Sequence, residues 1–334
     1  GIYTFTVVKS VAEATRVALE ASAASARLVG VQDVTIAVRD VGVSINLADA
    51  STDRVIDFAS SDFSVLTGPN SSHRMSMDGV NHEMLSVSAG VTIQLANYVY
   101  LDGTAAFEKR SDSMTLVDGT EVKVDALTVG AANVSAFAGL GGAYRTDTNA
   151  DGVVDDQDLL NPDSVGFSLS DVNFGMGLFY AQDGQLNAAG KSLNNVRWLA
   201  LSVDAGAVEV VGMPSLTLAV TSFEVQVNQV HNLANGVNAA NQVIDFSGNA
   251  YAVRTGGDSE INLEMDGNLG PLLRVQGEVS AQVGDFLSLS GVLSFEQSTQ
   301  ELTLNETADE VQRLSIEASS RAQPAVDPTK AAGY

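Results

Sequence analysis

Apolar and polar residues alternate along much of the chain, and this pattern predicts β-strands. Between Val87 and Leu95 every second residue is apolar. A period of two places these side chains on one face of a strand. The same phase continues from Val99 to Phe107, and the combined run is too long for one strand. We therefore expect a hairpin turn at Ala96-Asn97.

Two segments change the phase of this alternation partway along. In residues 216–227 the apolar positions shift phase at Thr221-Ser222, and in residues 34–46 they shift at Arg39-Asp40. A β-bulge inserts one extra residue into a strand and shifts the alternation in this way. The pattern therefore predicts a bulge or corner in both strands.

The chain contains a long internal repeat. The sequence RVIDFASSDFSVLTG at 54–68 recurs as QVIDFSGNAYAVRTG at 242–256. The same offset aligns residues 55–116 with the later copy without a gap, and a shorter offset aligns the residues before Val55. The difference falls within residues 229–242, where a loop is expected to accept insertions.

The repeat predicts how the chain is divided, and a weak echo near residues 314–319 indicates a third copy. We interpret the chain as slightly less than two units cut from a longer array. The predicted divisions are repeat unit A at 1–130, incomplete at its N-terminus, inter-unit strands at 131–198, repeat unit B at 199–317, and the start of a third unit or a tail at 318–334.

Residues 10–28 pose a conflict, because their alanine, glutamate and arginine content favours a helix. Their repeat partner, residues 192–210, alternates as a strand, and equivalent segments should share a conformation. We predict a strand over 16–30, with a helix as the alternative. The fold class predicted overall is all-β, an elongated repetitive antiparallel architecture, with a β-solenoid or chained sandwiches as alternatives.

Charge and composition limit the classes of partner and of chemistry that the chain is expected to have. The 334 residues include 41 acidic and 17 basic side chains, a net charge of −24, which repels phosphate backbones and anionic membranes. Nucleic acid is therefore not an expected partner. The absence of cysteine excludes disulfides and thiolate chemistry. We expect no transmembrane segment, because no apolar run reaches the ~20 residues of a spanning helix. The start at Gly1 suggests a processed chain or a segment of a longer protein.

The stretch DTNADGVVDDQDL at 147–159 spaces oxygen-bearing side chains as calcium loops do. Acidic or amide residues occupy positions one, three, five, nine and twelve, and Gly152 at position six permits a sharp turn. Calcium prefers six to eight hard oxygen ligands, which this spacing supplies. The candidate calcium ligands are Asp147, Asn149, Asp151, the carbonyl of Val153, Asp155 and Asp158.

With aspartate at position twelve, this stretch resembles the EF-hand-type loops of dockerins. The resemblance covers only these thirteen residues, and it departs from the family where Pro162 and a strand follow instead of a helix. A paired second loop is absent, so cohesin binding is not implied. We expect one Ca²⁺ ion at residues 147–158, acting as a structural brace; the alternative is an acidic surface turn.

Catalytic constellations are not evident in the sequence. His73, His82 and His231 fall in predicted loops and are expected to be solvated, and no serine forms a nucleophile elbow with them. Residues 139–142 lack the strand and helix context of a dinucleotide-binding loop. Trp198 lies in an alternating segment, and we expect it in the core. The sequence therefore predicts a protein that is not an enzyme.

The long repeat, the absence of cysteine, the acidic strands and the calcium loop together resemble the repeat regions of giant bacterial cell-surface proteins, adhesin-like or filament-forming. The resemblance implies an extracellular, calcium-stabilised stalk or filament at the bacterial cell surface, with neighbouring copies as partners and a possible homopolymer. The alternative is a surface adhesion module that recognises a protein or glycan through loops 69–84 and 229–242. A weaker alternative is a sheet that carries lipid on an apolar concave face.

Overall fold

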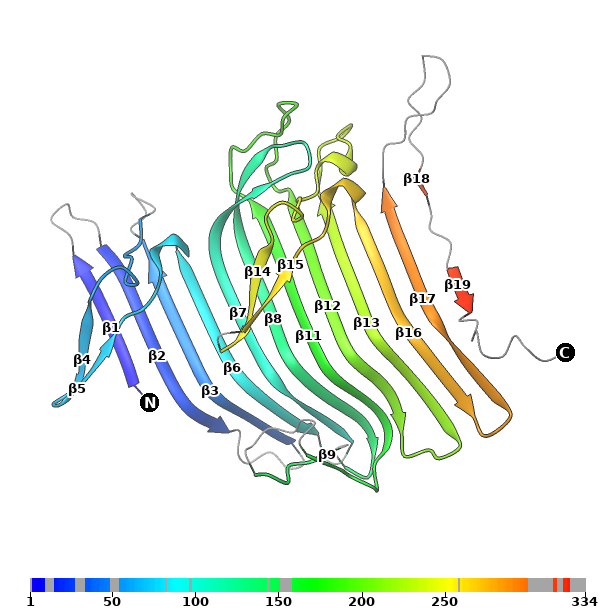
Figure 1. The fold of residues 1–334 in the computed structure, drawn as a ribbon. Helices are drawn as coiled ribbons and strands as arrows, with labels where there is room; N and C mark the ends of the chain where they lie inside the picture. Colours follow the sequence, from blue (N-terminus) through cyan, green and yellow to red (C-terminus); the bar gives the residue numbers. More distant parts are fainter. Residues whose placement is uncertain are drawn as a thin grey trace, which may run out of the picture.

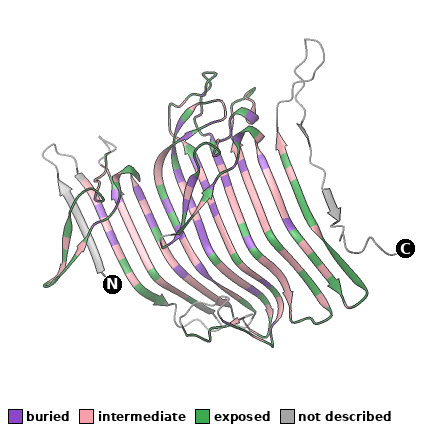
Figure 2. Cartoon of the chain, viewed as in Figure 1, coloured by how far each residue is buried: buried purple, intermediate pink, exposed green. Residues whose placement is uncertain are grey.

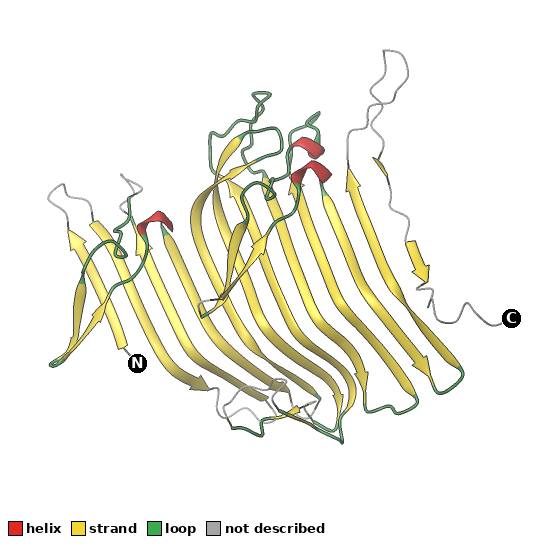
Figure 3. Cartoon of the chain, viewed as in Figure 1, coloured by secondary structure: helices red, strands yellow, loops and turns green. Residues whose placement is uncertain are grey.

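The computed structural model describes residues 2–9, 15–27, 34–48, 54–81, 83–95, 98–142, 145–150, 158–257, 259–299, 315–316 and 321–324. One antiparallel sheet of thirteen strands dominates these residues (Figure 1), and the short helical turns are confined to loops (Figure 3). The predicted all-β, elongated antiparallel architecture is confirmed.

The main sheet is an up-and-down meander, because its strands pair in chain order. It contains β1 (Ile2–Lys9), β2 (Thr15–Arg27), β3 (Val34–Leu47), β6 (Met84–Leu95), β7 (Val99–Thr115), β8 (Glu121–Leu140), β11 (Val165–Ala181), β12 (Arg197–Val211), β13 (Leu216–His231), β16 (Leu272–Val283) and β17 (Leu287–Thr299), with β18 (Ser315–Ile316) and β19 (Arg321–Pro324) paired to β17.

In the described part of the chain, three small hairpins lie outside the main sheet. They are β4 (Ser64–Gly68) with β5 (Ser71–Arg74), β9 (Arg145–Thr146) with β10 (Leu159–Leu160), and β14 (Tyr251–Gly256) with β15 (Ser259–Leu263). The 3-10 turns are η1 (Gly79–Asn81), η2 (Ala239–Asn241) and η3 (Gly267–Leu269).

The elements recur at the offset that aligns the two sequence copies. Strand β16 repeats β6 with the same bounds, η3 repeats η1, and the β14–β15 hairpin repeats the β4–β5 hairpin. The sheet continues from one copy into the next, because β7 pairs with β8, β8 with β11 and β11 with β12. The exact limits of the repeat units stay a prediction.

The predictions for single segments are confirmed where the structure describes them. Residues 16–27 of the strand predicted over 16–30 lie in β2, which pairs with β1 and β3, and residues 28–30 lie outside the described residues. Leu95 pairs with Val99 across the expected hairpin. The later copy has the same turn, where Val283 pairs with Leu287.

The two predicted bulges are also present. Asp40 and Ser222 have φ angles of 50° and 51°, and the strand register shifts beside each of them. Asn133 in β8 and Asp171 in β11 have φ angles of 52° and 53° at further register shifts. Short polar side chains tolerate this left-handed conformation best. The four bulges lie on strands that bend partway along their length (Figure 1).

One face of the sheet, called here the covered face, carries the β4–β5 and β14–β15 hairpins. The β14–β15 hairpin contacts β7, β8, β11 and β12. Beneath it lies the main core, in the part of the sheet where buried residues concentrate (Figure 2). Trp198 is buried in this core, as predicted. A smaller core of Ala18, Phe58, Met75 and Met77 lies near the β4–β5 hairpin.

Two glycines allow the β14–β15 hairpin to lie directly on the backbone of the sheet. A Cβ at Gly130 would stand 2.3 Å from the carbonyl oxygen of Arg254, and one at Gly175 would stand 2.3 Å from Cγ2 of Ile261. Both distances are far below van der Waals contact. Any larger residue at these positions must therefore push the hairpin away from the sheet.

Buried asparagines hold the segment before each hairpin in both copies. Nδ2 of Asn46 donates to the carbonyl of Ile56 at 2.8 Å, and Nδ2 of Asn228 donates to the carbonyl of Ile244 at 2.8 Å. Both asparagines are almost fully buried. Because a buried carbonyl without a partner costs about 1–3 kcal/mol, each asparagine satisfies a group that the crossing chain would otherwise leave unpaired.

The Gly130 contact generates a prediction. Gly130→Ala should lower the free energy of unfolding by about 1–3 kcal/mol, because the added methyl group overpacks the hairpin against the sheet. Urea unfolding followed by the fluorescence of Trp198 measures the change. Gly248→Ala is the matched control, because a Cβ at Gly248 would meet nothing within 4 Å. Equal stability of both variants would contradict the packing argument.

Candidate functional site

The candidate calcium loop is closed at its base by a short β-ladder. Strands β9 and β10 pair Thr146 with Leu159 and Arg145 with Leu160, so the two ends of the loop lie side by side. Three of the predicted ligands, Asp151, Val153 and Asp155, lie outside the described residues. Of the predicted ligands, the structure therefore describes only Asp147, Asn149 and Asp158, which lie toward the two ends of the loop.

Asp158, at position twelve, is turned toward the start of the loop. Its Oδ1 accepts hydrogen bonds from the backbone N of Thr148 at 2.9 Å and from Oγ1 of Thr148 at 3.2 Å. The side chain of Arg145 donates to the Asp158 carbonyl at 2.7 Å. A calcium loop must bring position twelve back to its first residues, and this arrangement does so.

The loop ends lie close to the covered face at Tyr100 of β7. Burial raises the pKa of the Tyr100 hydroxyl above its usual range, and the negative charges of Asp102, Asp147 and Asp158 raise it further. The hydroxyl is therefore protonated at neutral pH. Asp147 and Asp158, at the two ends of the loop, place negative charge where the sequence predicts the calcium ion. The full ligand set stays a prediction.

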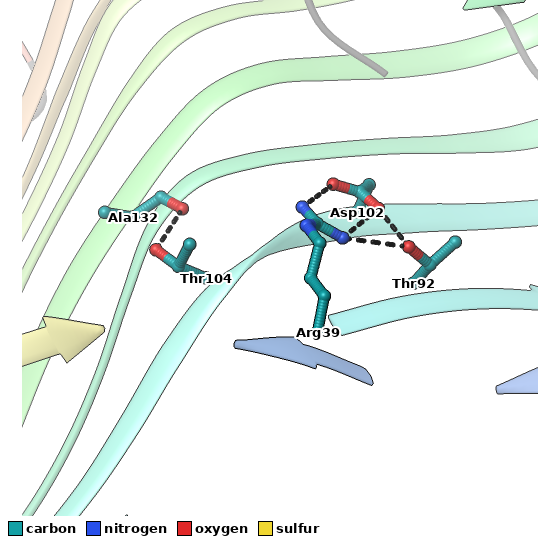
Figure 4. A network of polar contacts seen from close by, with 5 residues as sticks. All are labelled: Arg39, Thr92, Asp102, Thr104 and Ala132. Atoms are coloured by element: carbon teal, nitrogen blue, oxygen red, sulfur yellow. Dashed lines mark hydrogen bonds and ion pairs between the residues drawn. The ribbon is translucent and has the colours of Figure 1, made fainter. Parts of the chain in front are cut away.

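A charged network joins three strands next to the first bulge (Figure 4). Arg39 of β3 binds the Asp102 carboxylate of β7 through two hydrogen bonds of 2.7 and 3.1 Å, and it donates to Oγ1 of Thr92 of β6 at 3.2 Å. The Thr92 hydroxyl also donates to Asp102. Asp102 is only 1% exposed, so its buried negative charge must be stabilised by these hydrogen bonds and by the guanidinium of Arg39.

Glycine at position 90 makes room for this network. A Cβ at Gly90 would stand 2.5 Å from Cγ of Arg39, so the arginine side chain lies directly across the backbone of β6. Burial lowers the pKa of Arg39, but the hydrogen bond and charge of Asp102 outweigh that effect and raise it above the usual value. Beside the bulge at Asn133, Thr104 donates to the carbonyl of Ala132 at 3.2 Å (Figure 4).

No local pattern in the sequence predicted this network, although a comparison of the two copies contains a signal for it. The second copy has Thr221, Ser280 and Ser290 where the first has Arg39, Thr92 and Asp102. An arginine and an aspartate that disappear together between copies indicate a pair in contact. The network is thus specific to the first copy.

The histidine prediction needs a correction at His73. This residue lies in β5, not in a loop, and its Nε2 stands 2.6 Å from Oε2 of Glu20 in β2. Oε1 of Glu20 also accepts hydrogen bonds from the backbone N and hydroxyl of Ser76. Because the hydroxyl of Ser76 binds Glu20 rather than His73, the group is no serine–histidine relay. It fixes the β4–β5 hairpin to the sheet. His231 is exposed at the end of β13, and His82 lies outside the described residues.

A polar cavity of about 600 Å³ lies between the β14–β15 hairpin and β7. The guanidinium of Arg110 lies over the ring of Tyr251, 4.8 Å from its centroid, and its Nε donates to the hydroxyl at 3.0 Å. Arg110 also forms ion pairs with Glu108 and Asp112. Burial raises the pKa of Tyr251 above its usual range, so the phenol is no general base at neutral pH. These contacts hold the hairpin in place.

Comparison with known proteins does not assign the chain to a family. No model of a known protein family matches the chain, and no curated protein matches it. Among the described residues, no helix is long and apolar enough to cross a membrane. Within the same residues, no group of three or more histidine or acidic side chains is arranged to hold a metal ion, and residues 151–157 of the candidate loop lie outside that search.

The calcium loop generates a test at Asp158. Saturating Ca²⁺ should raise the melting temperature of the native chain, because an ion at 100 times its dissociation constant stabilises the folded state by about 2.7 kcal/mol. Asp158→Asn should abolish the shift, since the amide keeps an oxygen for Thr148 but loses the charge. Asp163→Asn, next to the loop and outside the predicted ligand set, is the control and should respond as the native chain does. A calcium shift that persists in Asp158→Asn would contradict the ligand assignment.

The Arg39 network generates a second test. Asp102→Ala should lower the free energy of unfolding by about 3 kcal/mol, because it leaves the guanidinium part-buried and unpaired. The double variant Arg39→Thr with Asp102→Ser places the residues of the second copy in the first, and it should recover most of that loss. Urea unfolding measures both. A double variant no more stable than Asp102→Ala would show that the loss does not come from the unpaired guanidinium.

Proposed function

We propose that the chain is a structural module of a tandem array whose repeats extend one continuous antiparallel sheet, forming a stalk or filament. The observation that supports this most is a core shared between copies. Met114 and Leu116 of the first copy pack with Ile244, Phe246 and Met265 of the second. The second copy is thus built onto the first.

Backbone contacts reinforce this junction. Leu116 forms an isolated antiparallel bridge with Ile244, and the backbone N of Asp245 donates to the carbonyl of Thr115 at 2.9 Å. The β14–β15 hairpin of the second copy also reaches back over β7 of the first. Consecutive repeats joined by a ladder, a shared core and an overlapping hairpin resist bending more than domains on a linker do.

The edge after β17 supports continuation of the array. In the first copy β7 pairs with β8, and in the second β17 pairs with the short strands β18 and β19. Among the described residues, these short strands pair with only part of β17, and a strand edge without a partner offers its backbone groups to another strand. In the proposed array, the next repeat occupies that edge in the way that β8 occupies the edge of β7.

Calcium, location and partners belong to the same proposal. The loop at 147–158 would bind one Ca²⁺ and brace the ends of β8 and β11. Export to the bacterial cell surface rests on the resemblance to giant surface proteins, and neighbouring copies are the proposed partners. A second candidate, adhesion through loops 69–84 and 229–242, is favoured by Val80, which is 77% exposed and is replaced by Asn268 in the second copy.

Small-angle scattering with calcium and with chelator tests the stalk. A compact globule of 334 residues has a radius of gyration of roughly 20 Å. We expect a clearly larger value with rod-like scattering, and a looser particle after chelation. A value near that of the globule, indifferent to calcium, would contradict the stalk and favour the adhesion module.

A further inference from the structure

The face of the sheet opposite the hairpins, called here the apolar face, is hydrophobic across nearly its whole width. Cross-strand partners share a face, so the strand register traces rows of side chains across the sheet. One row, running from β2 to β16, consists of Ala21, Val43, Val87, Phe107, Val129, Met176, Leu201, Val227 and Leu273.

A second row lies beyond the bulges and is equally apolar. It runs from β3 to β17 through Ile36, Ile93, Leu101, Ala136, Leu169, Val208, Val220, Val279 and Gly291. The bulges therefore keep the apolar side chains in phase on one face, although the sheet bends between the two rows.

Among the described residues, nothing covers this face. Phe107 is 37% exposed, Phe167 is 54% exposed and Leu289 is 59% exposed. The hairpins lie on the other side, because Gly130 and Gly175 face them while the neighbouring Val129 and Met176 point away.

The area of the apolar face is that of a stable interface. Ten neighbouring strands from β2 to β17, ~4.8 Å apart and at least ~40 Å long, give a surface on the order of 2,000 Å². A standard protein interface buries only about 800 Å² on each partner. Soluble monomers rarely expose apolar patches above a few hundred Å².

We propose that the apolar face packs against the same face of a second copy of this chain, which makes a two-layer sandwich. This inference deepens the proposed stalk and rests on it. The side chains are mainly valine, leucine, isoleucine and alanine, which suit two sheets packed about 10 Å apart. A second copy has an apolar face of the same length and width, and it buries the surface of both chains at once.

Charge favours a second copy over lipid. The chain carries a net charge of −24, yet the two rows contain no charged residue, so two acidic chains can approach face to face with their charges outside. Charged residues on this face gather toward one end of the strands, where Lys109, Lys123, Asp125 and Arg197 carry both signs. A mixed rim does not form the basic cluster that holds an anionic lipid headgroup.

Sedimentation equilibrium of the native chain and of Phe107→Glu tests the sandwich. The native chain should give twice its mass of 34.7 kDa, and Phe107→Glu should give the single mass, because a carboxylate cannot be buried between two apolar sheets. Circular dichroism and Trp198 fluorescence should show the variant folded. Leu66→Glu, at a position of β4 that is 83% exposed on the hairpin of the covered face, is the control and should stay dimeric.

Phe107→Ser provides a second readout if the charged variant does not fold. It removes buried apolar area without adding charge, and it should raise the dimer dissociation constant at least about tenfold. A native chain that is monomeric at micromolar concentration would overturn the proposal. So would organic extraction that finds stoichiometric lipid on a monomer, which would assign the face to lipid.

The sedimentation experiment on the sandwich can fail or succeed independently of the scattering experiment on the stalk. Phe107 is far from the edge beyond β17, so a monomeric Phe107→Glu chain that still scatters as a rod would retain the proposed array with the sandwich confirmed. A native dimer that scatters as a compact globule would retain the sandwich and contradict the stalk.

Discussion

The register of the antiparallel ladder is the constraint on which the rest of the structure depends. A slip of one residue would move the apolar side chains of a strand to its other face. The strands are long, and they bend, so a regular pleat cannot be kept along them. Asp40, Asn133, Asp171 and Ser222 each adopt a left-handed conformation where the register shifts. The bulges at these residues absorb the bend, and the side chains on either side return to the same face.

This register gives the two faces of the sheet different roles. The covered face contains the charged groups that fix each layer in place, such as Glu20 with His73 and Arg39 with Asp102. Glycines on the same face let a hairpin approach the backbone. The opposite face contains rows of aliphatic side chains without such partners. These polar contacts therefore join strands and a hairpin within the first repeat, and the opposite face is the one proposed to pack against a second chain.

Local patterns in the sequence were sufficient to predict the all-β class, the turn after β6 and two of the bulges. The phase shifts at Arg39-Asp40 and Thr221-Ser222 could be compared between two copies, whereas Asn133 and Asp171 lie where only one copy exists. The Arg39–Asp102 pair joins residues 63 positions apart, and no periodicity reports such a contact. The calcium spacing is local, so the sequence could predict it; the structure adds that Asp158 returns to Thr148.

The shared core explains why a chain without disulfides can maintain an extended shape. In a chain of separate domains, stiffness depends on linkers and on small interfaces. Here Leu116 of the first copy is fully buried among residues of the second, so bending at the junction would expose core side chains to water. Because the ladder crosses the same junction, bending would also break backbone hydrogen bonds. The junction between the two copies is therefore part of the main core, and both buried side chains and backbone hydrogen bonds oppose bending there.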